Sequence, residues 1–179
     1  MSSWNFRVPA LVLAVALLFG IGCSSNQNPT EPSETMSPML APTESVTSTL
    51  LNSVNLLVCR PLPYASSSVV IGPEGGTLLA GKTSLVIPRG ALQSQVAIKA
   101  EQISGSVNSV RFSPEGLRFS KPVTLTMSYD NCLLTLPAKR IVYTTEGLRV
   151  LELLQSLDLR LSRTVSASIE HFSRYAVAY

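Results

Sequence analysis

The sequence holds three cysteines, and their positions predict two kinds of sulfur chemistry. Cys23 follows a short segment with one cation, residues 1–7, and an uncharged apolar run, residues 8–22, which ends in glycine. A charged start, an apolar run and a small residue at a cleavage point are typical of a signal peptide. A cysteine directly after the small residue indicates a bacterial lipobox. We therefore expect a mature chain that begins at Cys23, with diacylglycerol bound to its sulfur through a thioether.

Two alternatives stay open for this segment. Gly20 stands where such signals usually carry leucine, so ordinary secretion without a lipid is one alternative. The other is an uncleaved membrane anchor. At about 1.5 Å per residue, the apolar run spans roughly 22 Å as a helix. That length is less than the hydrocarbon core of about 30 Å, which disfavours the anchor.

Cys59 and Cys132 are left as a pair once Cys23 is assigned to the lipid. Export to an oxidising compartment favours a disulfide between them. The bond would close a long loop, for which the chain-entropy model gives a stabilisation on the order of 4 kcal/mol. Two buried free thiols are the alternative.

Composition excludes several classes of site. The formal net charge is +3, and the cations are scattered along the domain. A nucleic-acid partner is therefore not expected, because it would need a basic stripe. His171 is the single histidine of the chain, so one chain cannot build a zinc or copper site from several imidazoles. No glycine loop of the phosphate-binding kind precedes a helix. We expect no metal, no cofactor and no general hydrolase activity.

The chain divides into four parts by composition. Residues 1–22 form the signal peptide, and residues 23–44 a disordered tether that is rich in Ser, Thr and Pro. Residues 45–65 are a lead-in, in which apolar residues recur at helical spacing over 45–58 and predict a short amphipathic helix. Residues 66–179 form the folded domain.

In this domain, apolar and polar residues alternate, and turn residues interrupt the pattern every 8–12 positions. Such segments are typical of short strands that bury one face. The pattern predicts nine strands, at 67–71, 83–87, 95–101, 107–112, 122–129, 140–144, 149–154, 164–169 and 174–178. The expected fold class is an all-β antiparallel sandwich. A helix over 148–161 is the alternative for one segment, because its leucines lie three residues apart.

Four stretches of the domain resemble one family when they are taken in order. They read "GPEGGT" from Gly72, "LVIPRGAL" from Leu85, "SPEGLRFSKPVTL" from Ser113 and "HFSRYA" from His171. This order resembles the ZU-five domain, a module named for zonula occludens proteins and Unc-type netrin receptors. The resemblance implies a β-sandwich that binds proteins or serves as a scaffold, not an enzyme. Within these motifs Pro122 is expected to begin a strand, since proline cannot donate to a ladder.

The resemblance also implies one chemical possibility. In some eukaryotic ZU-five tandems, a His-Phe-Ser triplet is cut by the protein itself, and His171, Phe172 and Ser173 occupy the matching place. The Ser173 hydroxyl would attack the carbonyl carbon of Phe172, the peptide would become an ester, and water would release it. His171 would accept the hydroxyl proton. The alternative is a last strand with His171 and Ser173 on one face and Phe172 in the core.

We therefore expect a non-catalytic β-sandwich on the outer side of a bacterial cytoplasmic or outer membrane. The membrane would be reached through the lipid on Cys23, and an unidentified protein would be the partner. A self-cleaving module is one alternative. The other is a module that binds a glycan or small ligand. The mature chain has no tryptophan for such a site, so its candidates are tyrosines, namely Tyr64, Tyr129, Tyr143, Tyr175 and Tyr179.

Overall fold

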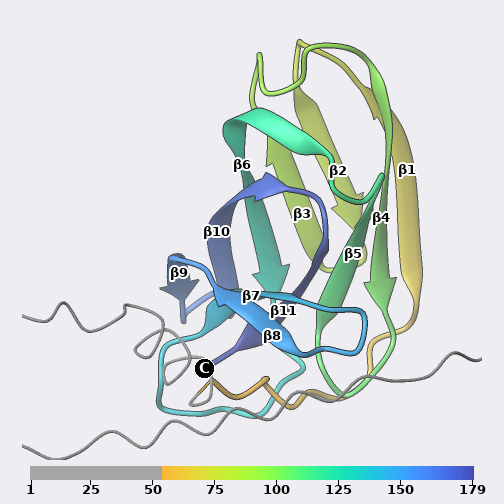
Figure 1. Ribbon diagram of the computed structural model, residues 1–179. Helices are drawn as coiled ribbons and strands as arrows, with labels where there is room; N and C mark the ends of the chain where they lie inside the picture. The colour runs from red at the N-terminus through yellow and green to blue at the C-terminus, as the bar shows by residue number, and fades with distance from the viewer. Residues whose placement is uncertain (1–53) are drawn as a thin grey trace, which may run out of the picture. The chain divides into compact units, whose positions relative to one another are not determined.

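The computed structural model describes residues 54–179, which form eleven strands in two antiparallel sheets (Figure 1). The predicted all-β sandwich is confirmed. Cys23, the predicted signal peptide, the predicted tether and the first part of the lead-in, up to residue 53, lie outside the described residues. Over the described range, no helix has the length and apolarity needed to cross a bilayer.

One sheet has six strands in the order β1-β4-β5-β11-β7-β8. Its strands are β1 (Ala65–Ile71), β4 (Val96–Ile103), β5 (Ser109–Ser113), β11 (Arg174–Ala178), β7 (Arg140–Thr144) and β8 (Val150–Leu153). The other sheet has five strands in the order β2-β3-β6-β10-β9. Its strands are β2 (Gly76–Ala80), β3 (Thr83–Ile87), β6 (Arg118–Ser128), β10 (Thr164–His171) and β9 (Ser156–Leu159).

The core lies between the two sheets and follows the alternation of the sequence. In β6, Val123, Leu125 and Met127 are buried, while Thr124 is exposed on the opposite face. All other strands except β8 and β9 add inner apolar residues to the same cluster. These strands thus remove an apolar face from water, which is the main favourable contribution to such a fold.

All nine predicted strands are present, and two more are found. The additional strands are β2 and β9. The alternative helix over 148–161 is wrong, because β8 and β9 occupy this segment. Pro122 does not begin a strand but lies inside β6, beside the register shift between Ile169 and His171 of β10. A bulge tolerates proline because the ladder is already interrupted there.

The helix predicted for 45–58 is wrong for its described part, residues 54–58, which are extended. Asn55 donates its N–H to the Tyr179 carbonyl at 3.1 Å and accepts from the Tyr179 N–H at 2.9 Å. Leu57 donates to the Val177 carbonyl at 2.9 Å. This lead-in therefore pairs with the end of β11 and buries Leu57 completely.

Candidate functional site

The triplet His171, Phe172 and Ser173 lies where the chain crosses from one sheet to the other. β10 ends at His171 in the five-stranded sheet, and β11 begins at Arg174 in the six-stranded sheet. The three residues therefore do not share one last strand, and that part of the structural alternative is wrong. Its other part is confirmed, because Phe172 is fully buried in the core.

Aromatic rings surround Phe172 at this corner. The Phe112 ring stacks on it at 5.0 Å between centroids, and the Phe119 ring meets it edge-on at 4.9 Å. Tyr175 closes the cluster and donates its hydroxyl to the His171 carbonyl at 2.6 Å. The corner is thus held by packing as well as by hydrogen bonds.

The backbone of the corner is fixed by the loop before β6. The Phe172 N–H donates to the Leu117 carbonyl at 2.8 Å, and the Gly116 N–H donates to the Phe172 carbonyl at 2.9 Å. A donor on this carbonyl would stabilise negative charge if the Phe172–Ser173 peptide were attacked. One requirement of the self-cleavage reaction is therefore present.

The base that the reaction needs is not aligned with the hydroxyl. The His171 ring packs edge-on against Tyr143 at 5.1 Å, and its Nδ1 lies 3.5 Å from the Phe172 carbonyl oxygen. Among the described residues, no hydrogen bond joins His171 to the Ser173 hydroxyl. A general base must lie within hydrogen-bond reach of the proton that it removes. The arrangement therefore favours a structural role for the triplet.

The outer face of the five-stranded sheet is a second candidate surface. Over the centre of this face, the outward side chains are hydroxyl-bearing or aliphatic, and they lie in cross-strand rows set by the registers of β2, β3, β6, β10 and β9. Charged residues, Arg118 of β6 and Glu170 of β10, are exposed toward one end of these two strands. The longest row holds Leu79, Ser84, Thr126, Ser166 and Leu157, and beside it lie Thr77, Val86, Thr124 and Ser168. None of these side chains is charged.

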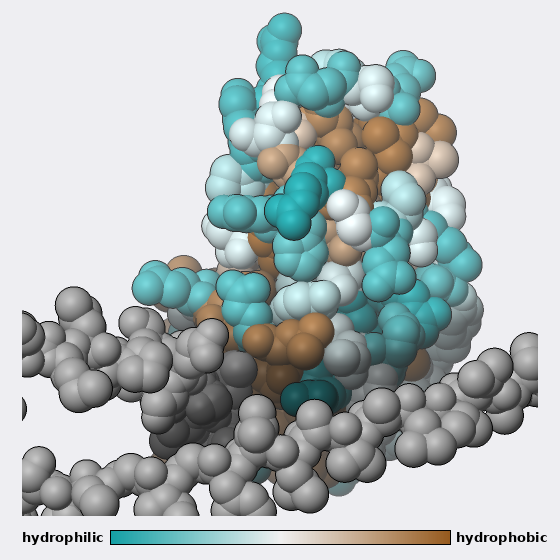
Figure 2. Space-filling view, viewed as in Figure 1, coloured by the Kyte–Doolittle hydropathy of each residue, from teal (hydrophilic) through white to brown (hydrophobic). Residues whose placement is uncertain are grey.

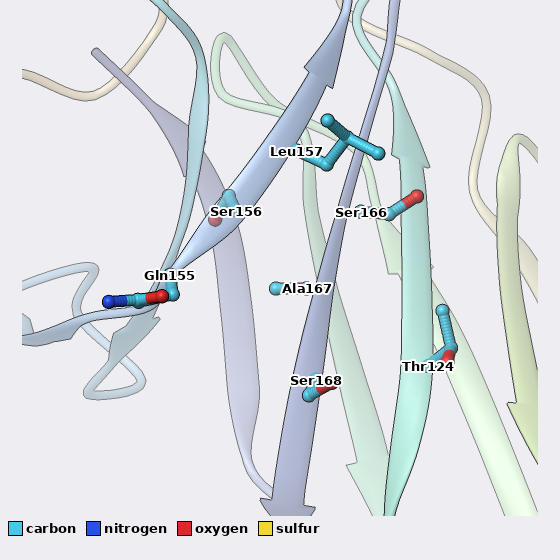
Figure 3. A pocket seen from close by; sticks show the side chains of 7 residues that line it. All are labelled: Thr124, Gln155, Ser156, Leu157, Ser166, Ala167 and Ser168. Atoms are coloured by element: carbon cyan, nitrogen blue, oxygen red, sulfur yellow. The ribbon is translucent and has the colours of Figure 1, made fainter.

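An open depression of about 530 Å³ lies on this face, between β6, β10 and β9. Figure 3 shows Ser166 and Ser168 on β10, with Thr124 on β6 to one side and Leu157 on β9 to the other. The Thr126 and Ser166 hydroxyls bond to each other at 2.7 Å. The surface is therefore suited to an uncharged partner that meets both hydroxyls and aliphatic groups.

The tyrosines considered for a glycan site do not form an exposed platform. Tyr129 and Tyr175 are buried, and Tyr143 and Tyr179 are half-buried. Tyr64 is exposed and donates its hydroxyl to the Glu101 carboxylate at 2.7 Å. Stacking against a sugar ring would require exposed aromatic faces, which four of these five residues do not offer.

A buried polar cluster, which the sequence analysis did not predict, lies beneath the loop between β6 and β7. The Asp158 carboxylate accepts from the Tyr129 hydroxyl at 2.5 Å and from the Lys139 N–H at 2.9 Å. The Lys139 ammonium donates to the carbonyls of Thr135 and Pro137. Because Lys139 is only 3% exposed, these bonds compensate the burial of its charge and hold the loop in place.

This environment shifts the pKa values of the three side chains. Burial and the hydrogen bond to Asp158 raise the pKa of Tyr129 to about 12. Burial lowers the pKa of Lys139. Burial alone would raise the pKa of Asp158, but the hydrogen bonds from Tyr129 and Lys139 keep it below its ordinary value. The only hint in the sequence was an aspartate between two leucines of an alternating segment.

The predicted disulfide between Cys59 and Cys132 is present at the same end of the sandwich. It joins the lead-in to the loop between β6 and β7. Over residues 54–179, no three His, Cys, Asp or Glu side chains are grouped as metal ligands would be.

Comparison with known proteins identifies no family, since no family model matches the sequence and a search of curated proteins finds no match. The resemblance to ZU-five modules therefore rests on the four motifs of the sequence.

Proposed function

We propose that this chain is an exported, lipid-anchored, non-catalytic β-sandwich of the ZU-five type that binds a protein partner in the bacterial envelope. The observation that carries the binding role is the uncharged centre of the outer face of the five-stranded sheet, where the two rows of hydroxyl-bearing and aliphatic side chains lie. The centres of protein interfaces are depleted of charged residues. A face of hydroxyls and aliphatic groups, without an aromatic platform, suits a protein surface better than a sugar.

The disulfide supports the exported location. Disulfides persist in oxidising compartments and are rare in the cytosol. The Cys59–Cys132 bond agrees in this respect with the signal-like segment that ends at Cys23. Both features support the proposal that the chain is exported.

Anchoring is tested by metabolic labelling with an alkyne-tagged palmitate in a bacterial host. Wild type and the matched control Ser24→Ala are expected to take up the label, and Cys23→Ser is not. Mass spectrometry of the purified protein should place the mature amino terminus at Cys23. An unlabelled wild type whose amino terminus lies elsewhere would refute the anchor.

The binding face is tested by placing a photo-crosslinking amino acid at one of two exposed serines. Ser168 lies on the proposed face, and Ser68 lies on β1 of the other sheet. In the native envelope, crosslinked protein products are expected from Ser168 and not from Ser68. Identical products from both positions, or none from Ser168, would contradict the proposed face.

Self-cleavage is kept as a second candidate because of the hydrogen bond from Gly116 to the Phe172 carbonyl. We expect intact protein, since no hydrogen bond joins His171 to the Ser173 hydroxyl in the described part of the chain. After cleavage, β11 would stay bound between β5 and β7, so the mass must be measured under denaturing conditions. A species that lacks residues 173–179, and is absent from Ser173→Ala, would establish cleavage instead.

A further inference from the structure

Four strongly exposed leucines gather at one end of the sandwich. Leu133, Leu134 and Leu136 lie in the loop between β6 and β7 and are 65%, 79% and 90% exposed. Leu161 lies in the turn between β9 and β10 and is fully exposed. Single exposed leucines are ordinary, but a group of this kind marks an interaction site. We call these four residues the leucine end.

The two loops of the leucine end are tied to each other. Arg160 donates from Nη2 to the Leu136 carbonyl at 3.1 Å, and Arg163 donates from Nη2 to the Cys132 carbonyl at 2.8 Å. The Leu133 N–H donates to the Val58 carbonyl at 2.9 Å, next to the disulfide. The four leucines therefore lie on two loops whose backbone is held in place by hydrogen bonds.

The same end carries an excess of positive charge. Its carboxylates are both in ion pairs, Asp130 with Lys82 at 2.6 Å and Asp158 with Arg160 at 3.5 Å. Arg60 and Arg163 add positive charge that no nearby carboxylate neutralises through an ion pair in the described part of the chain. Exposed leucines beside arginines suit the boundary between the headgroups and the acyl chains of an anionic bilayer.

The described chain also begins at this end. In Figure 1 the orange lead-in and the cyan loop between β6 and β7 run along the end of the sandwich where the carboxyl terminus is marked. Residues 1–53, which include Cys23, therefore join the domain beside the leucine end. A lipid on Cys23 would bring this end, through its connection to the domain, close to a membrane.

We propose that the leucine end inserts into the surface of an anionic bilayer, so that the anchored domain lies against the membrane. The orientation rests on the proposed anchor at Cys23. The affinity of the leucine end for lipid does not, because the leucines and arginines belong to the folded domain. These two parts can be tested separately.

The first test uses the mature chain, residues 23–179, with Cys23→Ser, so that no lipid is attached. This chain contains the whole described domain. Binding is measured by flotation with vesicles of phosphatidylcholine, with or without phosphatidylglycerol. We expect binding that requires phosphatidylglycerol and weakens with salt. Leu136→Ser with Leu161→Ser should weaken it by at least about tenfold, since burial of one leucine is worth about that factor.

The matched control is a pair of exposed aliphatic residues near the opposite end of the sandwich. Val70 is 60% exposed and Val86 is 46% exposed, near the ends of β1 and β3. Figure 2 shows apolar surface near the upper ends of these strands. Val70→Ser with Val86→Ser should bind vesicles as wild type does. Circular dichroism verifies that both double variants are folded.

The second test reads the orientation of the lipidated protein. The only tryptophan is Trp4, in the signal peptide, so a new tryptophan in the mature chain reports its own surroundings. In vesicle-bound lipidated protein, Leu136→Trp should show blue-shifted emission that brominated lipids quench. Val70→Trp should show neither effect.

The outcomes separate the two proposals. Vesicle binding that Leu136→Ser with Leu161→Ser leaves unchanged refutes the leucine end, and so does a dimer in solution that buries these leucines. Equal emission from Leu136→Trp and Val70→Trp refutes the orientation. If wild type takes up no palmitate while the unlipidated chain still binds anionic vesicles, the anchor is wrong and the leucine end stands.

Discussion

Removal of the Cys59–Cys132 disulfide is expected to lower the free energy of unfolding by about 4 kcal/mol. The bond joins positions 73 residues apart, and the chain-entropy model gives about this value for such a loop. Both cysteines are buried, and the Cys59 N–H donates to the Ser106 carbonyl at 2.8 Å. These neighbouring contacts do not depend on the sulfur atoms. The loss should therefore come mainly from the unfolded chain, which gains freedom when the bond is absent.

The measurement is guanidinium unfolding of three samples: oxidised wild type, wild type with reductant, and Cys59→Ala with Cys132→Ala. The double variant should match the reduced wild type and should not respond to reductant. Its m-value should rise, because an unfolded chain without the crosslink exposes more surface. Domains of this size have total stabilities of about 5–15 kcal/mol, so the shift is easily measured.

One result would refute this reasoning. If oxidised and reduced wild type differed by less than about 1 kcal/mol, restriction of the unfolded chain would not be the main effect of the bond. A loss confined to the double variant would point to the alanine substitutions in the folded state.

Three further predictions concern the folded domain. Gly116→Ala should lower the free energy of unfolding by about 1–2 kcal/mol, because alanine disfavours the left-handed backbone at this position. Gly75→Ala should lower it clearly more, because the added Cβ would also lie 2.4 Å from the Ile87 carbonyl oxygen. Equal losses for the two variants in chemical unfolding would contradict this expectation. Tyr129 and Tyr175 keep their protons above the ordinary tyrosine pKa of about 10, so stability should fall as the pH rises from about 10 through about 12, less steeply in Tyr129→Phe; absorbance titration and unfolding at each pH check this. Phe172→Ala should lower the free energy of unfolding by about 3–5 kcal/mol, and a loss below about 1 kcal/mol would show that the corner is not packed as described.

The strands that were predicted from the sequence share one property: most of their inner positions are apolar. β9 reverses this pattern. Leu157 and Leu159 are exposed, while Asp158 accepts hydrogen bonds in the interior and the Ser156 hydroxyl accepts from the Ile141 N–H at 2.9 Å. With polar residues inside, the alternation is inverted, and the leucine spacing suggests a helix instead. In β2, Leu78 and Leu79 are adjacent and face opposite sides, which hides the alternation.

Hydrophobic periodicity also gave the wrong secondary structure for the lead-in. Its apolar residues recur at helical spacing, yet an extended chain buries them on two sides. Leu57 belongs to the core between the sheets, whereas Leu56 and Val54 pack against Ala178 and its neighbours on the outer side of the six-stranded sheet. The spacing of apolar residues over so short a segment cannot distinguish a helix from an extended chain. The extended form is stabilised by pairing with β11, which is far from the lead-in in the sequence.

At the candidate site, burial and disulfide formation could be predicted from the sequence, but the three-dimensional arrangement of the residues could not. A buried Phe172 follows from its large apolar side chain, which stands between the polar residues His171 and Ser173. The disulfide follows from the cysteine count and the expected export. The corner between β10 and β11 was not predicted, because a chain that changes sheets has the same local pattern as a continuous strand. The leucine end was not predicted either, since Leu136 and Leu161 look like core residues by type alone.

The position of β11 has a consequence for how the protein is made. β11 lies inside the six-stranded sheet, between β5 and β7, although it is the last strand in chain order. Ribosomes synthesise the amino end first, so β1, β4 and β5 are made before β11, the strand that joins them to β7 and β8. The lead-in also lacks its partners until β11 is made, because it pairs with Val177 and Tyr179. A nascent chain therefore cannot complete this sheet until translation has passed Tyr179, and a premature stop codon before Arg174 removes the middle of the sheet.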